Sequence, residues 1–190
     1  MIFPCPRLVD SFARAGYLTV APDLFDGDPA LADIELPGFN TTDFINRHGT
    51  DATDPIIHRS IAYLREELGI QRIGVPGYCF GGKYSFRFVA EGWGADVAFA
   101  AHPTLWTDEE VEAIVGPAAV AAAEVDARMS PADRAHMEAL LANTTQPYQV
   151  NLYSQTSHGF AVRGNASIPM ERFGKEQAFI QAVTWFDHFL

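Results

Sequence analysis

The feature that most constrains this chain is a glycine-rich turn, Gly77-Tyr78-Cys79-Phe80-Gly81-Gly82. Residues 71–75 before it are predicted to form a short strand, and residues 84–90 after it continue as a helix. A Gly-x-Cys-x-Gly turn between a strand and a helix is typical of a nucleophile elbow, in which a strained backbone lifts one reactive side chain out of a sheet. The turn therefore predicts that Cys79 is a nucleophile.

The position of the turn also predicts how the thiol is activated. A helix N-terminus behind Cys79 favours the thiolate, and the next backbone N–H, that of Phe80, is placed to bind a developing oxyanion. We expect a side chain at either flanking glycine, Gly77 or Gly81, to clash with the turn. The alternatives are a tight turn with a buried inert cysteine and a phosphate-binding loop, although Lys83-Tyr84 does not supply the lysine–serine/threonine pair of such a loop.

A thiolate nucleophile needs a general base, and His158 is the best candidate among the six histidines. It follows the last apolar strand, in Ser157-His158-Gly159-Phe160, where catalytic residues of α/β folds lie. The alternative is a solvated loop histidine. His102 precedes Pro103 at a strand end, where it either lines the site or has a structural role. The remaining histidines that we considered fall in helical segments and are expected on the surface: His58, His136 and His188.

A third group should orient the histidine, and it should lie between Cys79 and His158 in the chain. Glu124 and Asp126 both qualify by position, near the end of the alanine-rich segment 117–125. Asp126 is preferred, because a carboxylate just past a strand can reach across to a histidine. Glu124 remains the alternative acid.

Strand and helix patterns alternate along the chain, which predicts a parallel sheet with right-handed crossovers in one domain over residues 1–190. Asp54 and Pro55 read as the N-cap and first residue of a helix, and residues 30–53 read as a long irregular excursion. The predicted strands are residues 17–22, 71–75, 96–101, 117–125 and 148–153. The predicted helices are residues 7–15, 54–69, 84–90, 130–142 and 175–190.

Composition narrows the classes of partner. The net charge of −11 argues against nucleic acid and against anionic membrane surfaces. No apolar run reaches the roughly 18 residues of a membrane span, and the first residues lack the pattern of a signal peptide. The two cysteines, Cys5 and Cys79, are expected to be free thiols, which fits a reducing, cytoplasmic location.

Taken together, these segments resemble the dienelactone hydrolase family, and most closely its fungal branch. The resemblance begins at about Leu8 and implies an α/β-hydrolase fold, a mostly parallel sheet with helices on both faces and with its first strands missing. It is carried by Gly-Tyr-Cys-Phe-Gly-Gly-Lys from Gly77, Ala-His-Pro from Ala101, Glu-Val-Asp from Glu124 with Pro131, Ser-His-Gly-Phe-Ala-Val-Arg-Gly from Ser157 and Ala-Val-x-Trp-Phe from Ala182.

The resemblance implies a Cys-Asp-His triad on Cys79, Asp126 and His158, the residues that the spacing also selects. It implies hydrolysis of a small carboxylic ester or lactone through a covalent acyl-enzyme, without a metal or organic cofactor. Arg163 follows the histidine closely, where an arginine of the family helps to hold a substrate carboxylate. By residue type alone, further pocket-lining candidates are Tyr78, Phe80, His102, Trp106 and Phe160.

The N-terminus departs from the family pattern. Full members have further strands before the first helix, and the loop after them supplies a second oxyanion N–H; Met1-Ile2-Phe3-Pro4 corresponds to the end of that loop. Two readings stay open, an N-terminally incomplete hydrolase and a diverged, impaired one. Missing strands would leave a sheet edge that can pair with a second chain, so self-association is a candidate interaction.

Two other functions compete with hydrolysis. One is a catalytically impaired homologue that binds a small acid or a protein partner. The other is a redox-sensing thiol at Cys79, which is least favoured because no second cysteine lies near it in the sequence to resolve a sulfenic acid.

Overall fold

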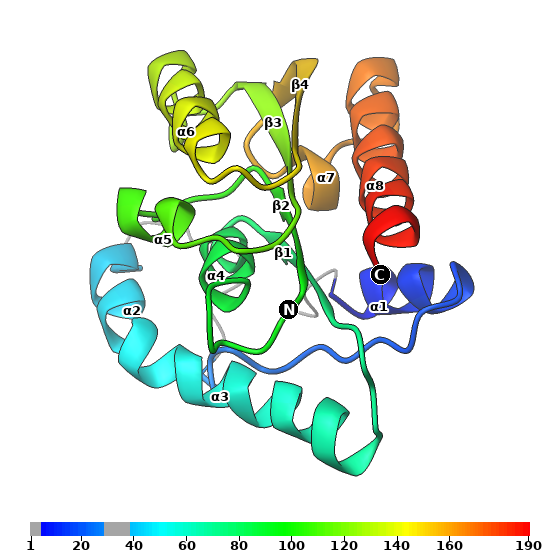
Figure 1. Cartoon of the computed structure of the whole chain (residues 1–190). Helices are drawn as coiled ribbons and strands as arrows, with labels where there is room; N and C mark the ends of the chain where they lie inside the picture. The colour runs from blue at the N-terminus through cyan, green and yellow to red at the C-terminus, as the bar shows by residue number, and fades with distance from the viewer. Residues whose placement is uncertain (1–4, 29–38) are drawn as a thin grey trace. The chain divides into compact units, whose positions relative to one another are not determined.

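The computed structural model describes residues 5–28 and 39–190. The chain divides into two compact units, Met1–Gln71 and Arg72–Leu190, which follow the blue-to-cyan and green-to-red parts of the ribbon in Figure 1. The single domain expected over residues 1–190 stays a prediction. All the residues that the sequence predicts for the site, from Tyr78 to Arg163, belong to the second unit.

The second unit is built on a parallel sheet of four strands in the order β1-β2-β3-β4 (Figure 1). The strands are β1 (Gly74–Tyr78), β2 (Val97–Ala101), β3 (Ala118–Val125) and β4 (Tyr148–Ser157). Parallel neighbours need a crossover connection, and helices supply it between each pair. The predicted parallel α/β architecture is confirmed.

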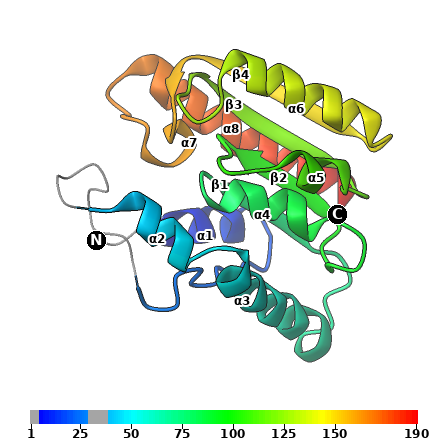
Figure 2. The same cartoon turned by 90° about the vertical axis from the view of Figure 1, so that its left-hand side faces the viewer.

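Helices cover both faces of this sheet (Figure 1 and Figure 2). One face carries α4 (Gly81–Phe88) against β1 and β2, and α6 (Pro131–Asn143) against β3 and β4. The short helix α5 (Asp108–Glu112) packs against both α4 and α6. The other face carries α8 (Pro169–Phe189), and α7 (Phe160–Arg163) contacts it.

The core lies where the central strands meet these helices. Every residue of β2 is buried, and so are the first six residues of β3, as expected for parallel strands that are covered on both faces. Small alanines dominate both strands, and larger side chains from the helices, such as Phe86, Met137 and Leu141, fill the space above them. Burial of one such side chain contributes about 1.5–3 kcal/mol.

Four predicted elements of the second unit are longer or shifted. α4 runs from Gly81 to Phe88 rather than over residues 84–90. β1 runs to Tyr78 rather than ending at Val75, because Pro76 and Gly77 pair with Phe99 and Ala100 instead of forming the turn. Among the described strands, β1 pairs only with β2. On its other side it has no hydrogen-bonded neighbour in the described part of the chain, so a proline, which lacks an N–H, loses no ladder bond there. β4 continues to Ser157, and α8 begins at Pro169. The predicted helix start at Ser130 is confirmed by a capping box between Ser130 and Asp133.

The first unit contains helices only, within its described residues. These are α1 (Cys5–Arg14), α2 (Thr41–Arg47), α3 (Thr50–Ala62) and the π-helical turn η1 (Tyr63–Glu67). Gly16 and Gly69, both with positive φ, follow α1 and η1, and the predicted helix end at each is confirmed.

Two predictions in the first unit are wrong. Residues 17–22 form no strand, because no described residue offers them a hydrogen-bonded ladder. Helix α3 begins at Thr50 rather than at Asp54, so Pro55 lies inside it. The earlier start has a local cause, since the backbone N–H groups of Ala52 and Thr53 donate to the Gly49 carbonyl and the Thr53 hydroxyl donates to that of His48. The irregular excursion expected over residues 30–53 is therefore interrupted by α2 and by the start of α3.

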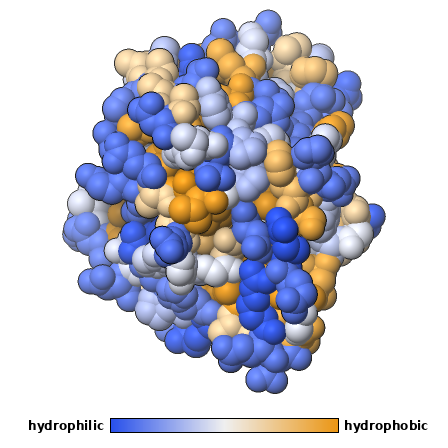
Figure 3. Space-filling view, in the orientation of Figure 1, coloured by the Kyte–Doolittle hydropathy of each residue, from blue (hydrophilic) through white to orange (hydrophobic). Residues whose placement is uncertain are grey.

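The space-filling view is mainly hydrophilic, with apolar residues interspersed (Figure 3). Several large apolar side chains are exposed, among them Val125 (66%), Leu152 (49%) and Phe173 (51%). None of the helices within the described residues has the length and apolar character needed to cross a membrane.

Candidate active site

Each of the four strands is followed at once by a side chain that can take part in chemistry. Cys79 follows β1, His102 follows β2, Asp126 follows β3 and His158 follows β4. Because the strands are parallel, their carboxyl ends lie at one edge of the sheet, which is where α/β proteins place their sites. The fold thus gathers residues that are up to 79 positions apart in the sequence.

Cys79 has the strained backbone of a nucleophile elbow. Its φ is +53°, in the left-handed region that residues with a Cβ rarely adopt. Three hydrogen bonds hold this conformation. The Cys79 N–H donates to the Ala101 carbonyl (3.1 Å), and the Cys79 carbonyl accepts from the N–H groups of Gly82 (3.0 Å) and Thr104 (3.2 Å). The turn is therefore tied to the neighbouring strand and to the loop that follows it.

The glycines around Cys79 are not equivalent. A Cβ on Gly77 would lie 2.2 Å from the Gly81 carbonyl oxygen, and one on Gly82 would lie 2.7 Å from the Pro103 Cβ. At Gly81 nothing lies within 4 Å of the added atom. The prediction of a clash is confirmed for Gly77 and wrong for Gly81, because it is Gly82 that faces the loop after β2.

His158 connects the thiol to a carboxylate. Its Nε2 lies 3.0 Å from the Cys79 Sγ, and its Nδ1 lies 2.9 Å and 3.0 Å from the two carboxylate oxygens of Asp126. The Asp126 side chain is fully buried, and its Oδ1 also accepts from the Arg128 N–H (2.8 Å). The three predicted side chains therefore form one hydrogen-bonded chain, with the imidazole in the middle.

Glu124 lies elsewhere. Its Oε2 accepts from the Gln155 N–H (2.7 Å) and from the Ser154 hydroxyl (3.2 Å), both on β4. The carboxylate that contacts His158 is that of Asp126, so the geometry gives the alternative acid no contact with the histidine.

The electrostatics of the site favour a charged thiol. Burial alone would raise the pKa of Cys79, but the hydrogen bond and charge of His158, the Phe80 N–H and the charge of Arg163 together hold that pKa below its ordinary value. The Phe80 amide is thus directed at the sulfur. The second oxyanion donor expected from Met1–Pro4 lies outside the described residues.

The interactions with Cys79 and Asp126 raise the pKa of His158. Burial alone would lower the pKa of His158, but the hydrogen bonds and charges of Asp126 and Cys79 raise it to about 9. Burial would raise the pKa of Asp126, yet its bonds to His158 and to the Arg128 N–H keep it lowered. The opposite shifts of Cys79 and His158 both favour a thiolate beside an imidazolium over the neutral pair.

Arg163 stands at the end of α7 beside this pair. Its guanidinium lies across Gly159, where an added Cβ would come within 2.6 Å of Nη2. The residue is exposed, and its charge lowers the pKa of Cys79 and of His102. A cation that is both accessible and close to the thiol is suited to binding an anionic group.

The other predicted pocket residues occupy different positions. His102 is fully buried, with its ring 5.1 Å from that of His158 and 5.5 Å from that of Phe160, which is also buried. Burial and the nearby charges of His158 and Arg163 lower the pKa of His102 to about 3. The His102 ring thus packs between those of His158 and Phe160, and neither buried ring offers an open surface to a ligand. Tyr78 is partly exposed beside His102, whereas Trp106 packs against the core and lies near His136.

The remaining histidines are not part of this hydrogen-bonded chain. His58, His136 and His188 are exposed on helices, as predicted, and His136 contacts Asp108 (2.8 Å). His48, which the sequence patterns did not single out, is buried in the first unit and contacts Asp28 (3.0 Å). Within the described residues, no group of three or more His, Cys, Asp or Glu side chains is arranged to hold a metal ion. Cys79 is a free thiol.

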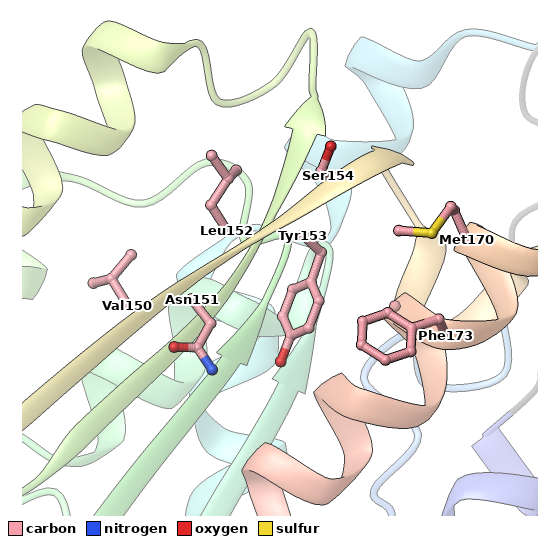
Figure 4. A pocket seen from close by; sticks show the side chains of 8 residues that line it. Val150, Asn151, Leu152, Tyr153, Ser154, Met170 and Phe173 are labelled. Carbon is pink, nitrogen blue, oxygen red and sulfur yellow. The ribbon is translucent and has the colours of Figure 1, made fainter.

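A hollow of about 430 Å³ lies between β4 and the start of α8 (Figure 4). Asn151 and Tyr153 point to one side of the strand, and Val150 and Leu152 to the other. None of the three hydrogen-bonded side chains lines it. Tyr153 donates to Gln181 Oε1 (2.9 Å), and its ring packs on the buried Phe160, so the hollow is separate from the thiol.

A sequence model described as the dienelactone hydrolase family matches residues 5–190. The chain belongs to the dienelactone hydrolase family. Among its relatives, it is 45% identical over 183 residues to the hydrolase pyvD of Aspergillus violaceofuscus and 37% identical over 193 residues to the hydrolase tropI of Talaromyces stipitatus. Each alignment covers 96% of this chain and 74% of the relative.

The fold has a matching neighbour among solved structures. A dienelactone hydrolase-type protein from Klebsiella pneumoniae superimposes with a TM-score of 0.78 at 16% identity, over 98% of this chain and 81% of that one. The predicted family and α/β-hydrolase fold are confirmed. Membership in this family makes the chain a hydrolase of the ester and lactone type.

The unequal glycines give a test of the turn. Gly77→Ala should lower the free energy of unfolding by about 1–3 kcal/mol, because the new Cβ has backbone and Ser85 in its way. Gly81→Ala should stay within about 1 kcal/mol of the parent, since its Cβ meets nothing. Urea unfolding of both variants measures the difference, and equal destabilisation would contradict this account of the turn.

The charged pair gives a test by thiol alkylation. The rate of Cys79 alkylation by iodoacetamide should rise with pH through an inflection below that of an ordinary thiol. Asp126→Asn should lower the pKa of His158 and raise that of Cys79, because the imidazolium loses its anionic partner. The inflection then moves up, and the rate at mildly acidic pH falls about tenfold. An unchanged profile in Asp126→Asn would show that the carboxylate does not support the pair.

Proposed function

We propose that this protein hydrolyses a small carboxylic ester or lactone, with Cys79 as nucleophile, His158 as general acid and base, and Asp126 as the group that orients the imidazole. The observation that supports this most is the hydrogen-bonded chain from the Cys79 Sγ through both nitrogens of His158 to the buried Asp126 carboxylate. The strained turn at Cys79 and the family membership point in the same direction.

In the first half-reaction the Cys79 thiolate attacks the carbonyl carbon, and the C=O electron pair moves onto the oxygen. The Phe80 N–H, which is directed at the sulfur, is placed to donate to this oxyanion. When the C–O bond breaks, the His158 Nε2–H gives its proton to the leaving oxygen, and a thioester remains on Cys79. In a lactone the leaving oxygen stays attached to the acyl group.

In the second half-reaction His158 acts as a base. Its neutral Nε2 takes a proton from water, the water oxygen attacks the thioester carbonyl, and the C–S bond breaks to give the acid and the thiolate. One water is consumed, and the thiolate–imidazolium pair is restored. Asp126 keeps the same imidazole nitrogen facing the sulfur in both steps, because it holds Nδ1.

Arg163 gives the site a preference among substrates. Its exposed guanidinium acts on Cys79 through its charge, and it has no hydrogen-bonded partner among the described residues. We assign it the carboxylate of an anionic ester or lactone. Tyr78 and Phe80, both partly exposed, are predicted pocket residues that can contact the acyl group through their rings.

The proposal predicts a burst. An activated aryl ester should release about one equivalent of phenol rapidly and further product slowly, if acylation is faster than deacylation. Cys79→Ala and His158→Ala should each lower turnover by about 10³-fold or more.

The matched control is His136→Ala, which removes an exposed histidine that contacts Asp108 and should leave turnover unchanged. No turnover by the parent protein, together with a thiol of ordinary reactivity, would favour the catalytically impaired homologue. Turnover that survives Cys79→Ala would contradict the proposed nucleophile.

The role of Arg163 predicts a selective loss. Arg163→Gln should raise KM about tenfold for an ester that carries a free carboxylate, because a charge-assisted contact is lost. KM for a neutral ester of similar size should change little. Initial rates with the two esters measure this, and equal effects on both would contradict the assignment.

A further inference from the structure

We propose that Glu124 is a positioning residue, whose carboxylate holds a bulge in β4 that sets His158 opposite Asp126. This inference rests on the proposed role of His158 and extends it to a residue that contacts none of the three reacting side chains. The inference is based on the pairing of β3 with β4.

The pairing changes register just before the site. Ala123 pairs with Tyr153, but Val125 pairs with Ser157, so two steps along β3 correspond to four steps along β4. Gln155, inside the extra segment, has φ +58°. Extra residues and a residue with positive φ are the marks of a β-bulge, which bends a strand and re-aims the side chains that follow.

The shift decides which residue faces Asp126. If the pairing of Ala123 with Tyr153 continued unchanged, the position opposite Asp126 would be Thr156. With the bulge, Val125 faces Ser157, and the next position along β4 is His158. A shift of two residues keeps the side chains on the same face of the strand, because their directions alternate. The bulge thus puts His158 rather than Thr156 opposite Asp126, with the side chain on the same face of the strand.

Glu124 is the side chain that holds the bulge. A single oxygen, Oε2, accepts both the N–H of Gln155 (2.7 Å) and the hydroxyl of Ser154 (3.2 Å). The Thr156 hydroxyl donates to the Tyr153 carbonyl (2.7 Å) and closes the same segment from the β4 side. Bonds to a carboxylate are stronger than neutral ones, and here they stabilise a residue in a strained conformation.

Glu124 and Asp126 are two residues apart and so act as a pair at the end of β3. The first carboxylate fixes the bulge, and the second binds the histidine that the bulge delivers. Since His158 must reach Asp126 and Cys79 at 2.9 Å and 3.0 Å together, relaxation of the bulge would lengthen at least one of these contacts. Misplacement by about 1 Å can cost as much as 10²-fold in rate.

The test compares Glu124→Gln with Glu124→Asp. The amide oxygen of Gln can still accept both hydrogen bonds, because a single oxygen accepts them now. The Asp carboxylate keeps the charge but is one methylene too short to reach the Gln155 N–H. Glu124→Gln should therefore keep kcat within about twofold of the parent, whereas Glu124→Asp and Glu124→Ala should lower it about 10- to 100-fold with little change in KM.

The second readout is the pH profile of Cys79 alkylation, which reports the Cys79–His158 pair and needs no ester. Its inflection should move up in Glu124→Asp and stay in place in Glu124→Gln. Glu138→Ala, which removes an exposed carboxylate from α6, is the matched control and should change neither readout. Circular dichroism checks that each variant is folded, and the Gln–Asp comparison still decides if Glu124→Ala is not.

The outcomes separate two failures. If Glu124→Asp behaves like the parent, or if Glu124→Gln is as impaired as Glu124→Asp, Glu124 does not position His158 by these hydrogen bonds. If the parent protein turns over no ester, the proposed function fails, and the alkylation profiles alone decide the role of Glu124.

Discussion

The alignment of four parallel strand ends at one edge of the sheet is the constraint on which the site depends. Cys79, His102, Asp126 and His158 each come first after a strand, so the strand register sets their mutual distances. The buried β2 and β3 hold that register with a core of small alanines and larger helix side chains. The distances between the site residues therefore depend on how the side chains pack against the sheet.

Backbone strain is concentrated at the same edge. Four residues with side chains adopt positive φ at the ends of the strands or in the loop after β2: Cys79 (+53°), His102 (+39°), Leu105 (+60°) and Gln155 (+58°). Each conformation of this kind costs about 1–3 kcal/mol and persists only where the surroundings hold it. Here the holding groups are the hydrogen bonds of Cys79 to β2 and its following loop, and those of Glu124 to β4. The strain aims the thiol and the imidazole at one another.

Much of the site could be predicted because its signals are local. The glycines around Cys79, the position of His158 after an apolar strand and the chain order of nucleophile, acid and histidine are all visible in the sequence. The fold class followed from the alternation of strands and helices. The sequence predicts a clash at Gly81, but the structure has it at Gly82. The contact that excludes a Cβ there comes from Pro103, twenty-one positions away, and so is not visible in the local sequence.

The remaining errors share a cause, which is that pairing partners are not encoded nearby. Residues 17–22 have the composition of a strand, but a strand forms only with a ladder to bond to. No turn residue in the sequence marks the bulge at Gln155. The sequence therefore predicts Glu124 only as an alternative to Asp126 for the acid that orients His158. His102 and Phe160 carry residue types suited to a pocket, yet the fold buries both of them and packs His102 against His158.

The most direct test of the central claim is the mass of the intact protein after rapid acid quench of its reaction with an activated ester. The account predicts a gain equal to one acyl group, carried by the peptide that contains Cys79 and absent in Cys79→Ala. Turnover with the adduct on another residue, or an adduct that persists in Cys79→Ala, would contradict it.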